Sequence, residues 1–109
     1  MQEKRAHTRT NISFPVECSF LPQRNYFYTV TRDLGRGGLQ IITNKFIAKD
    51  NIIKVNINLI DKIITTKAKV AWCNKTRASE RYCAGLRFVE MSKPSQKQIG
   101  NFLDKLTPV

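Results

Sequence analysis

The sequence has few of the residues that enzymes use for catalysis. It contains one histidine, His7, and eight Asp and Glu residues against nineteen Lys and Arg residues. No Ser-His-Asp, Cys-His or HExxH arrangement can be assembled around His7, and no pair of carboxylates suggests general acid and base chemistry. A lone histidine in a polar N-terminal stretch is typical of an exposed side chain. We therefore expect a protein that is not an enzyme.

Cysteines and long apolar runs are also scarce. The three cysteines, Cys18, Cys73 and Cys83, form no CxxC pair, so the sequence predicts neither a disulfide framework nor a metal site, and no cofactor is indicated. We expect them to be reduced and mostly buried in a cytoplasmic protein. No stretch approaches the ~18 consecutive apolar residues of a membrane span. The first eleven residues are polar and charged, and they do not resemble a secretory signal.

Positive charge is what the sequence has in excess. The formal net charge of +11 attracts an anionic partner. The charge alone does not distinguish nucleic acid, anionic lipid, an acidic protein surface and a dianionic dinucleotide. Most of the basic residues are spread along the chain, as on a solvated surface. Only Arg5 and Arg9, and with them Lys4, Arg32 and Arg36, stand beside a recognisable motif.

The apolar residues alternate with polar ones over most of the chain, which is the period of strands with one buried face. A chain of 109 residues is long enough for one domain with a single core. The alternation predicts strands over residues 12–20, 26–32, 39–43, 53–59, 63–72 and 82–89. Because these strands follow one another without intervening helices, we expect a mainly β fold, a six-stranded antiparallel β-barrel.

Three positions in this pattern need separate interpretation. Pro15 cannot donate to a strand ladder, so its strand is expected at an edge, a bulge or a barrel seam. Residues 44–51 lack a pattern and predict a loop, in which Phe46 and Ile47 cover the core. Trp72 either closes the core or offers its face to a base, and the core is the favoured interpretation.

The last apolar residues change to the spacing of an amphipathic helix. They are Ile99, Phe102, Leu103 and Leu106. The helix, at about 93–106, begins either at Ser92, with Pro94 in the first turn, or at Ser95 with Gln98 as a capping box. It is expected to close one end of the barrel or to cover its side. The predicted organisation is thus a basic arm over residues 1–11 and a single domain over residues 12–109.

A glycine-rich segment lies between the second and third predicted strands. Its sequence is Asp33-Leu34-Gly35-Arg36-Gly37-Gly38, called the glycine turn below. Its glycines allow positive φ angles and a close approach to a ligand, and successive N–H groups form an anion-binding concavity. The Asp33 carboxylate only accepts hydrogen bonds, which suits the N1–H and N2–H2 edge of guanine. The alternative is a simple hairpin turn.

The N-terminal arm supplies the complementary chemistry. Arg5 and Arg9 lie four residues apart, and each offers a planar donor fork that pairs with phosphate or with guanine and stacks on purine rings. An arm carrying both can fold over a ligand that is seated against the glycine turn. The alternative is a disordered basic N-terminus without a site.

Three motifs together resemble the PilZ domain family of bacterial cyclic-di-GMP receptors. They are Arg5-x-x-x-Arg9, Asp33-x-Gly35-x-x-Gly38 and Tyr82-x-x-Gly85-Leu86-x-Phe88. The resemblance implies a PilZ-like barrel with a C-terminal helix, whose ligand is cyclic-di-GMP. It implies binding by Arg5, Arg9, Asp33, Gly35, Gly37 and Gly38, with Lys4 and Arg36 beside them. Gly35 stands where the family has serine, so the hydroxyl contact is absent here.

By this resemblance the protein relays the level of the second messenger to an unknown protein effector by ordering its arm. The family's outputs include motility, exopolysaccharide synthesis and adhesion, and no residue selects among them. One alternative is a small basic β-barrel that binds nucleic acid, with Tyr26, Phe27 and Tyr28 as a stacking strip. Another is a degenerate PilZ-like adaptor that binds only protein.

Overall fold

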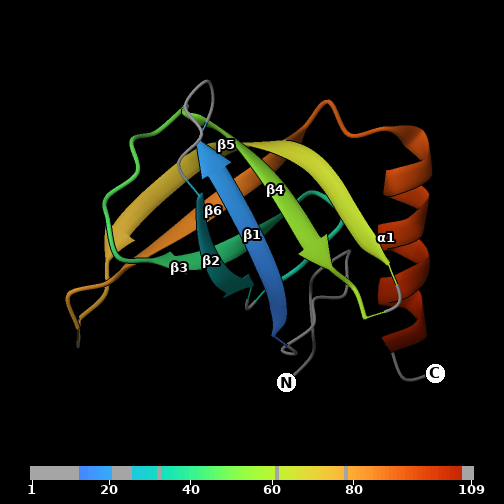
Figure 1. Ribbon diagram of the computed structural model, residues 1–109, viewed down its shortest axis with the longest axis horizontal. Coiled ribbons are helices and arrows are strands. Elements are labelled where there is room, and N and C mark those ends of the chain that lie inside the picture. The colour runs from blue at the N-terminus through green and yellow to red at the C-terminus, as the bar shows by residue number, and fades with distance from the viewer. Residues whose placement is uncertain (1–12, 21–25, 32, 61, 78, 107–109) are drawn as a thin grey trace, which may run out of the picture.

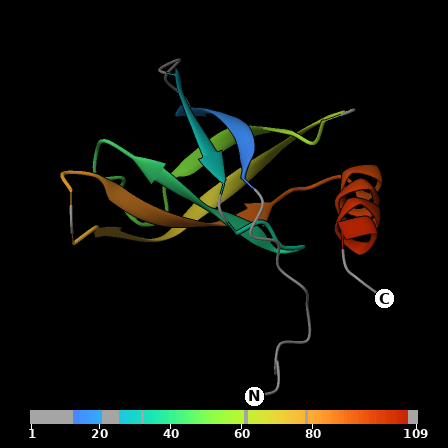
Figure 2. The same ribbon diagram turned by 90° about the horizontal axis from the view of Figure 1, so that it is seen from below.

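The chain forms a closed antiparallel β-barrel with a helix at one end (Figures 1 and 2). The computed structural model describes residues 13–20, 26–31, 33–60, 62–77 and 79–106. The elements are β1 (Phe14–Phe20), β2 (Tyr26–Thr31), β3 (Gly38–Thr43), β4 (Ile52–Asn58), β5 (Ile63–Lys75), β6 (Tyr82–Val89) and α1 (Lys93–Leu106). Around the barrel the strand order is β1-β2-β3-β6-β5-β4, and β4 pairs with β1 to close it. The predicted fold class is confirmed.

The barrel core follows from the alternation of apolar residues. In β4 the side chains of Ile53, Val55 and Ile57 are fully buried, while Lys54 and Asn58 are exposed. The residues paired with the buried ones on β5 are buried in turn, because directly opposed residues of an antiparallel pair lie on the same face. The clearest sequence pattern therefore produced the most regular part of the fold.

Trp72 departs from this alternation, and the prediction that its side chain lies in the core was wrong. The β5–β6 register shifts between Val70, which opposes Leu86, and Trp72, which opposes Gly85. Ala71 is the extra residue of this β-bulge. One extra residue moves the side chains that follow it in the strand to the opposite face of the sheet. Trp72 therefore points outward and is 39% exposed, whereas Cys73 packs against the core.

Of the three places expected for the strand with Pro15, the edge is excluded, since β1 pairs with β2 on one side and on the other with β4, the pairing that closes the barrel. Pro15 opposes Val30 of β2, but the register with β4 begins one residue later, at Val16. Pro15 therefore lies near the end of the strand, outside the described register with β4. A residue that lacks an N–H is tolerated at such a position.

Residues 44–51 form the predicted loop between β3 and β4. Ile47 is buried in the core, as expected, and its backbone N–H lies 3.5 Å from the Cys73 sulfur. Phe46 was expected to cover the core as well, but it is 61% exposed and packs edge-on against Tyr82 with ring centroids 6.0 Å apart. Only one of two neighbouring apolar residues can face inward in this extended segment.

Helix α1 spans the predicted residues and stands at one end of the barrel (Figures 1 and 2). Of the two proposed caps, Ser92 is the one used, since its hydroxyl accepts a hydrogen bond from the Ser95 N–H at 3.2 Å. Ile99 and Leu103 are buried, and Phe102 contacts Phe14 at the start of β1 with ring centroids 5.2 Å apart. These side chains fix the helix against the barrel.

The three cysteines are free thiols, but only Cys18 is fully buried, and Cys73 and Cys83 are half-buried. Burial, with a contribution from the charge of Glu17, raises the pKa of the Cys18 thiol to about 12. Among the residues described, no group of three or more histidine, cysteine or acidic side chains is placed to hold a metal ion. No described helix is both long enough and apolar enough to cross a membrane.

These surroundings predict different reactivities for the three thiols. In the folded protein at a pH near 9, the pKa of Cys18 lowers its thiolate population about a thousandfold relative to a free cysteine, and burial blocks access as well. Alkylation with iodoacetamide, followed by mass spectrometry of the peptides, should modify Cys73 and Cys83 well before Cys18. In denaturant all three should react at similar rates, and rapid alkylation of native Cys18 would contradict the packing of β1.

Candidate functional site

The glycine turn joins β2 to β3 and is fixed from both sides. Leu34 is fully buried and anchors the turn in the core. Within the turn the Gly35 N–H donates to the Gly38 carbonyl at 2.9 Å, and the Phe88 N–H of β6 donates to the Gly37 carbonyl, also at 2.9 Å. The expectation that these glycines adopt positive φ was wrong, because no described glycine has a positive φ.

The glycines instead allow close approach of neighbouring groups. A Cβ at Gly38 would clash with the backbone carbonyl of Leu86, and a Cβ at Gly85 would clash with the Trp72 indole. At Gly37 a Cβ would meet nothing within 4 Å. The lack of side chains therefore lets β3 and β6 pack closely and lets the indole lie flat against the outer surface of the barrel.

A shallow hollow of about 230 Å³ lies on this outer surface, beside the glycine turn. Its lining includes Gly37 and Gly38, the Trp72 indole and Arg87. Within the described chain Arg87 forms no ion pair, and its side chain is exposed. An aromatic ring and a guanidinium beside a glycine backbone provide a stacking surface and a cation for a purine nucleotide.

Asp33 lies at the start of the turn and is partly buried. Its carboxylate accepts a hydrogen bond from the Gln40 amide at 3.0 Å, and Gln40 also lines the hollow. The Gln40 carbonyl oxygen in turn lies 3.5 Å from the Cys83 sulfur, which donates to it. Gln40 thus orients the Asp33 carboxylate beside the hollow.

The structure places Arg36 against helix α1. Its guanidinium forms an ion pair with Asp104 at 2.8 Å and lies so close to Gly100 that a Cβ there would clash with it. Arg36 does not belong to the lining of the hollow. Of the described site residues predicted from the sequence, only Gly37 and Gly38 line the hollow. Asp33 is hydrogen-bonded to the lining residue Gln40, Gly35 is hydrogen-bonded within the turn, and Arg36 connects the turn to the helix.

Lys4, Arg5 and Arg9 lie outside the described residues, so their place in the site stays a prediction. The described chain begins just before β1. Phe14 pairs with Thr31, two residues before Asp33, so the start of β1 lies near the glycine turn.

Sequence reasoning missed Gln40, Trp72 and Arg87 as members of the site. Trp72 was considered as a face for a base, but the alternation favoured the core. Arg87 and Gln40 carry a signal that could have been used, since each is polar, lies on the outer face of its strand and is two residues from a motif glycine. Their proximity depends on the β3–β6 register, which pairs Gly38 with Arg87 and Gln40 with Gly85.

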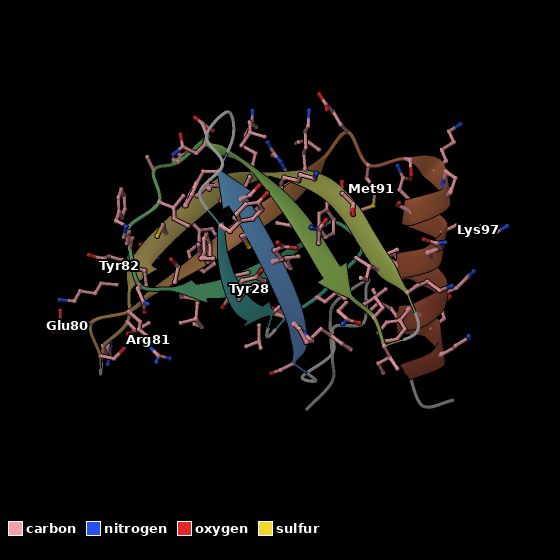
Figure 3. All side chains as sticks on the ribbon, viewed as in Figure 1. Tyr28, Glu80, Arg81, Tyr82, Met91 and Lys97 are labelled. Atoms are coloured by element: carbon pink, nitrogen blue, oxygen red, sulfur yellow. The ribbon has the colours of Figure 1, made fainter. Side chains whose placement is uncertain are left out.

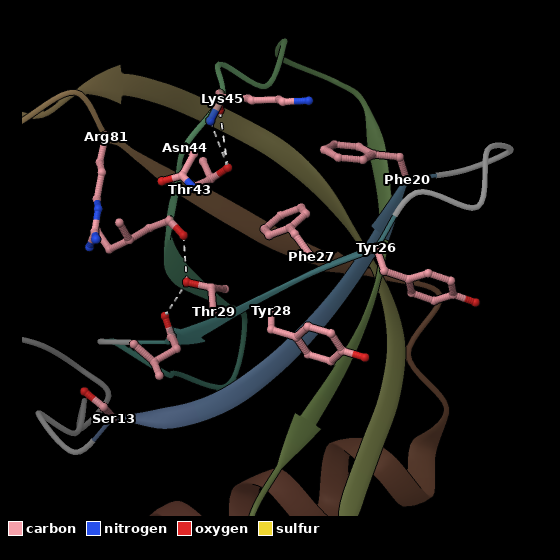
Figure 4. Close-up of a pocket in the computed structure, with 12 residues that line it drawn as sticks. Ser13, Phe20, Tyr26, Phe27, Tyr28, Thr29, Thr43, Asn44, Lys45 and Arg81 are labelled. Atoms are coloured by element: carbon pink, nitrogen blue, oxygen red, sulfur yellow. Dashed lines mark hydrogen bonds between the residues drawn. The ribbon is translucent and has the colours of Figure 1, made fainter.

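A second and larger hollow, of about 1030 Å³, lies between β2 and the end of β3 (Figure 4). None of the described residues predicted to bind cyclic-di-GMP lines it, whereas Tyr26, Phe27 and Tyr28, named for the nucleic-acid alternative, do. Size alone would favour this hollow, but the chemistry expected of the glycine turn is found at the smaller one. We therefore treat the smaller hollow as the candidate ligand site.

Comparison with known proteins places the whole barrel in one family. The family model described as PilZ domain matches residues 3–105. The solved PilZ domain with c-di-GMP of YcgR from Escherichia coli is 13% identical, with a TM-score of 0.75, and the match covers 95% of this chain and 92% of that chain. No curated protein matches this chain.

Two longer proteins share the fold. The inhibitor of motility MotI from Bacillus subtilis is 17% identical, with a TM-score of 0.79 and coverage of 96% of this chain and 51% of that chain. MrkH from K. pneumonia is 18% identical, with a TM-score of 0.80 and coverage of 97% of this chain and 51% of that chain. The chain thus spans about half the length of these two proteins.

The contacts of the turn predict a contrast between two adjacent glycines. Gly38→Ala should lower the free energy of unfolding by about 1–3 kcal/mol, because the new Cβ must displace the β6 backbone at Leu86. Gly37→Ala is the matched control and should change it by less than about 0.5 kcal/mol. Urea denaturation of both variants measures the difference. Equal effects would contradict the close approach of β3 and β6.

Proposed function

Because the chain belongs to the PilZ domain family, we propose that it is a receptor that binds cyclic-di-GMP without changing it chemically and relays this signal to a protein effector. The observation that carries the proposal is the hollow beside the glycine turn, which Gly37, Trp72 and Arg87 line, and to which Asp33 is connected through its hydrogen bond with Gln40. Each of these groups matches a part of the ligand.

Asp33 supplies the recognition of guanine in this proposal. Its carboxylate accepts hydrogen bonds only, and the N1–H and N2–H2 edge of guanine offers donors at matching positions. The Gln40 amide already holds the carboxylate at the rim. A pre-oriented acceptor loses less conformational freedom when the ligand binds, which favours affinity.

Trp72 and Arg87 supply the surface on which a base can lie. The indole is supported by Gly85 beneath it and remains partly exposed. A purine stacked on an aromatic ring gains about 1–3 kcal/mol per base. Arg87, which opposes Gly38 across the β3–β6 ladder, adds positive charge for a phosphate.

The arm completes the proposed site. Arg5 and Arg9, with Lys4 beside them, would close over the ligand and pair with its phosphates and guanines. The pairing of Phe14 with Thr31 supports this, because it puts the start of β1, which follows the arm in the sequence, near the glycine turn. Ordering of the arm by the ligand would change the surface that an effector contacts, and this is the proposed relay.

We also propose that the protein has no enzymatic activity and acts in the cytoplasm. The one histidine of the sequence, His7, belongs to the arm and has no motif partner for catalysis. Three free thiols suit a reducing compartment. The downstream process remains one of motility, exopolysaccharide synthesis or adhesion, which the residues do not separate.

The strongest competing function is binding of single-stranded nucleic acid along β2. Tyr26 and Tyr28 are 60% and 78% exposed, which favours stacking, but Phe27 points inward and packs against Phe20 with ring centroids 5.5 Å apart. The expected strip of three aromatic residues is therefore divided between two faces. This division favours the dinucleotide site over a continuous nucleic-acid platform.

Calorimetric titration with cyclic-di-GMP tests the proposed function. Arg5→Ala and Arg9→Ala should each weaken binding by about 1–3 kcal/mol, because each removes a donor fork from the ligand. Thermal stability should stay nearly unchanged. The fluorescence of Trp72, the sole tryptophan, provides a second measurement of binding beside the turn.

Arg77→Ala is the matched control, since Arg77 is exposed in the β5–β6 loop and lines neither hollow. It should bind like the natural chain. A titration with oligothymidylate at several salt concentrations tests the nucleic-acid alternative, which requires a steep salt dependence. If both arm variants bind cyclic-di-GMP as tightly as the natural chain, the arm does not belong to the site. If the natural chain does not bind cyclic-di-GMP, the protein-only adaptor is favoured.

Gly35 allows a gain of function to be predicted. Its φ is not positive, so a side chain is compatible with its backbone conformation. Gly35→Ser restores the hydroxyl of the family pattern and should tighten cyclic-di-GMP binding by about 0.5–1.5 kcal/mol, roughly threefold to tenfold. Gly35→Ala is the matched control and should give no gain. Equal affinities of the serine and alanine variants would exclude a hydroxyl contact.

A further inference from the structure

The barrel is almost open between β2 and β3. Residues 14–19 of β1 pair continuously with residues 26–31 of β2, but β2 and β3 are paired only at Thr31 and Ile41 among the described residues. From Tyr26 to Val30, β2 therefore has a ladder partner on one side only within the part of the chain that the structure describes. In such a strand the N–H and C=O groups of alternate residues point toward the unpaired side.

A side chain replaces the missing ladder at the narrow end of this opening. The Thr29 hydroxyl donates to the Ile42 carbonyl at 2.6 Å, which ties the two strands together without pairing their backbones (Figure 4). Beyond this bond the strands diverge: the described residues form no further β2–β3 pair, and the larger hollow is lined by residues of both strands. The divergence creates the larger hollow, called the seam groove below.

The seam groove has an apolar and an unpaired basic part. Phe20 and Phe27, which pack on each other, form its apolar side, and Lys45 and Arg81 also line it (Figure 4). Neither Lys45 nor Arg81 forms an ion pair with any described residue. Tyr28 stands at the edge, and Figure 3 shows Arg81 and Tyr82 at the end of the barrel away from α1.

We propose that the seam groove is a docking site for an extended acidic peptide segment of a partner protein. The segment adds to the free edge of β2 by main-chain hydrogen bonds. Alternate side chains contact Phe20 and Phe27, and carboxylates on the segment pair with Lys45 and Arg81. In strand addition of this kind, main-chain hydrogen bonds supply affinity, and the contacts of alternate side chains supply specificity.

The unpaired strand edge favours a peptide over a nucleic acid. A nucleic acid would use the cations and the tyrosines, but it has no use for a row of main-chain donors and acceptors at strand spacing. An extended acidic peptide can use the strand edge, the apolar side and the basic residues of the groove. The groove shares no lining residue with the hollow at the glycine turn, so this proposal does not rest on the proposed binding of the dinucleotide.

The test uses the full chain without dinucleotide and a synthetic end-blocked peptide of alternating valine and glutamate. Amide shifts in the NMR spectrum should move at residues 26–29 and 42–45. A peptide with lysine in place of glutamate, and one with every amide N-methylated, should each bind at least about tenfold more weakly, because they lose the charge pairs and the main-chain donors respectively.

Two pairs of variants separate the groove from the general positive charge. Lys45→Glu and Arg81→Glu should each weaken peptide binding about tenfold. The matched controls are Lys49→Glu and Arg77→Glu, which make the same charge change at exposed positions outside the groove and should stay within about twofold. Circular dichroism verifies that all four variants are folded.

Each other outcome overturns the proposal. Absence of shifts at millimolar peptide, or shifts confined to residues outside the groove, would remove the docking site. Equal weakening in the groove variants and their controls would mean binding by net charge alone. Stronger shifts of the same amides with oligothymidylate than with the peptide would assign the groove to nucleic acid. None of these results depends on cyclic-di-GMP.

Discussion

The close approach of Gly38 to the Leu86 carbonyl is the contact on which the candidate site depends. It allows β3 to lie against β6, and the Gly37 carbonyl then receives the Phe88 N–H at 2.9 Å. The glycine turn is thereby fixed to the strand that carries Arg87. A side chain at position 38 would push β3 away from β6 and move the turn relative to the cation beside it, because closely packed strands leave no room for the added atom. The site is thus a property of the β3–β6 pairing as a whole.

Much of the fold could be predicted because apolar residues recur at every second position in a strand that buries one face. The alternation in β4, with Ile53, Val55 and Ile57 inward, is an example, and so is the helical spacing of Ile99 and Leu103. The bulge at Ala71 could not be predicted, because a single inserted residue leaves no composition signal and yet reverses Trp72 and Cys73. The burial of Ile47 and exposure of Phe46 likewise depend on the path of an irregular loop.

The candidate site was predicted in part for a similar reason. Asp33 and the glycines are contiguous, so a local motif is enough to find them. Gln40, Trp72 and Arg87 join them only through the register of β3, β5 and β6, which a single sequence does not specify. Of the two properties expected of the glycines, positive φ was wrong, and the close approach of a ligand stays a prediction. The glycines permit close packing between strands rather than unusual backbone angles, and both requirements select the same residue type.

The ion pair between Arg36 and Asp104 has a consequence for how the turn meets anions. Both side chains are largely exposed to solvent, at 47% and 68%, so the pair contributes at most about 1 kcal/mol, and salt screens it. A phosphate that competes for the guanidinium can therefore exchange with Asp104 at little expense to the fold. Arg36, which joins the turn to the C-terminal helix, can therefore exchange the Asp104 carboxylate for an anion from solution at a small cost in free energy.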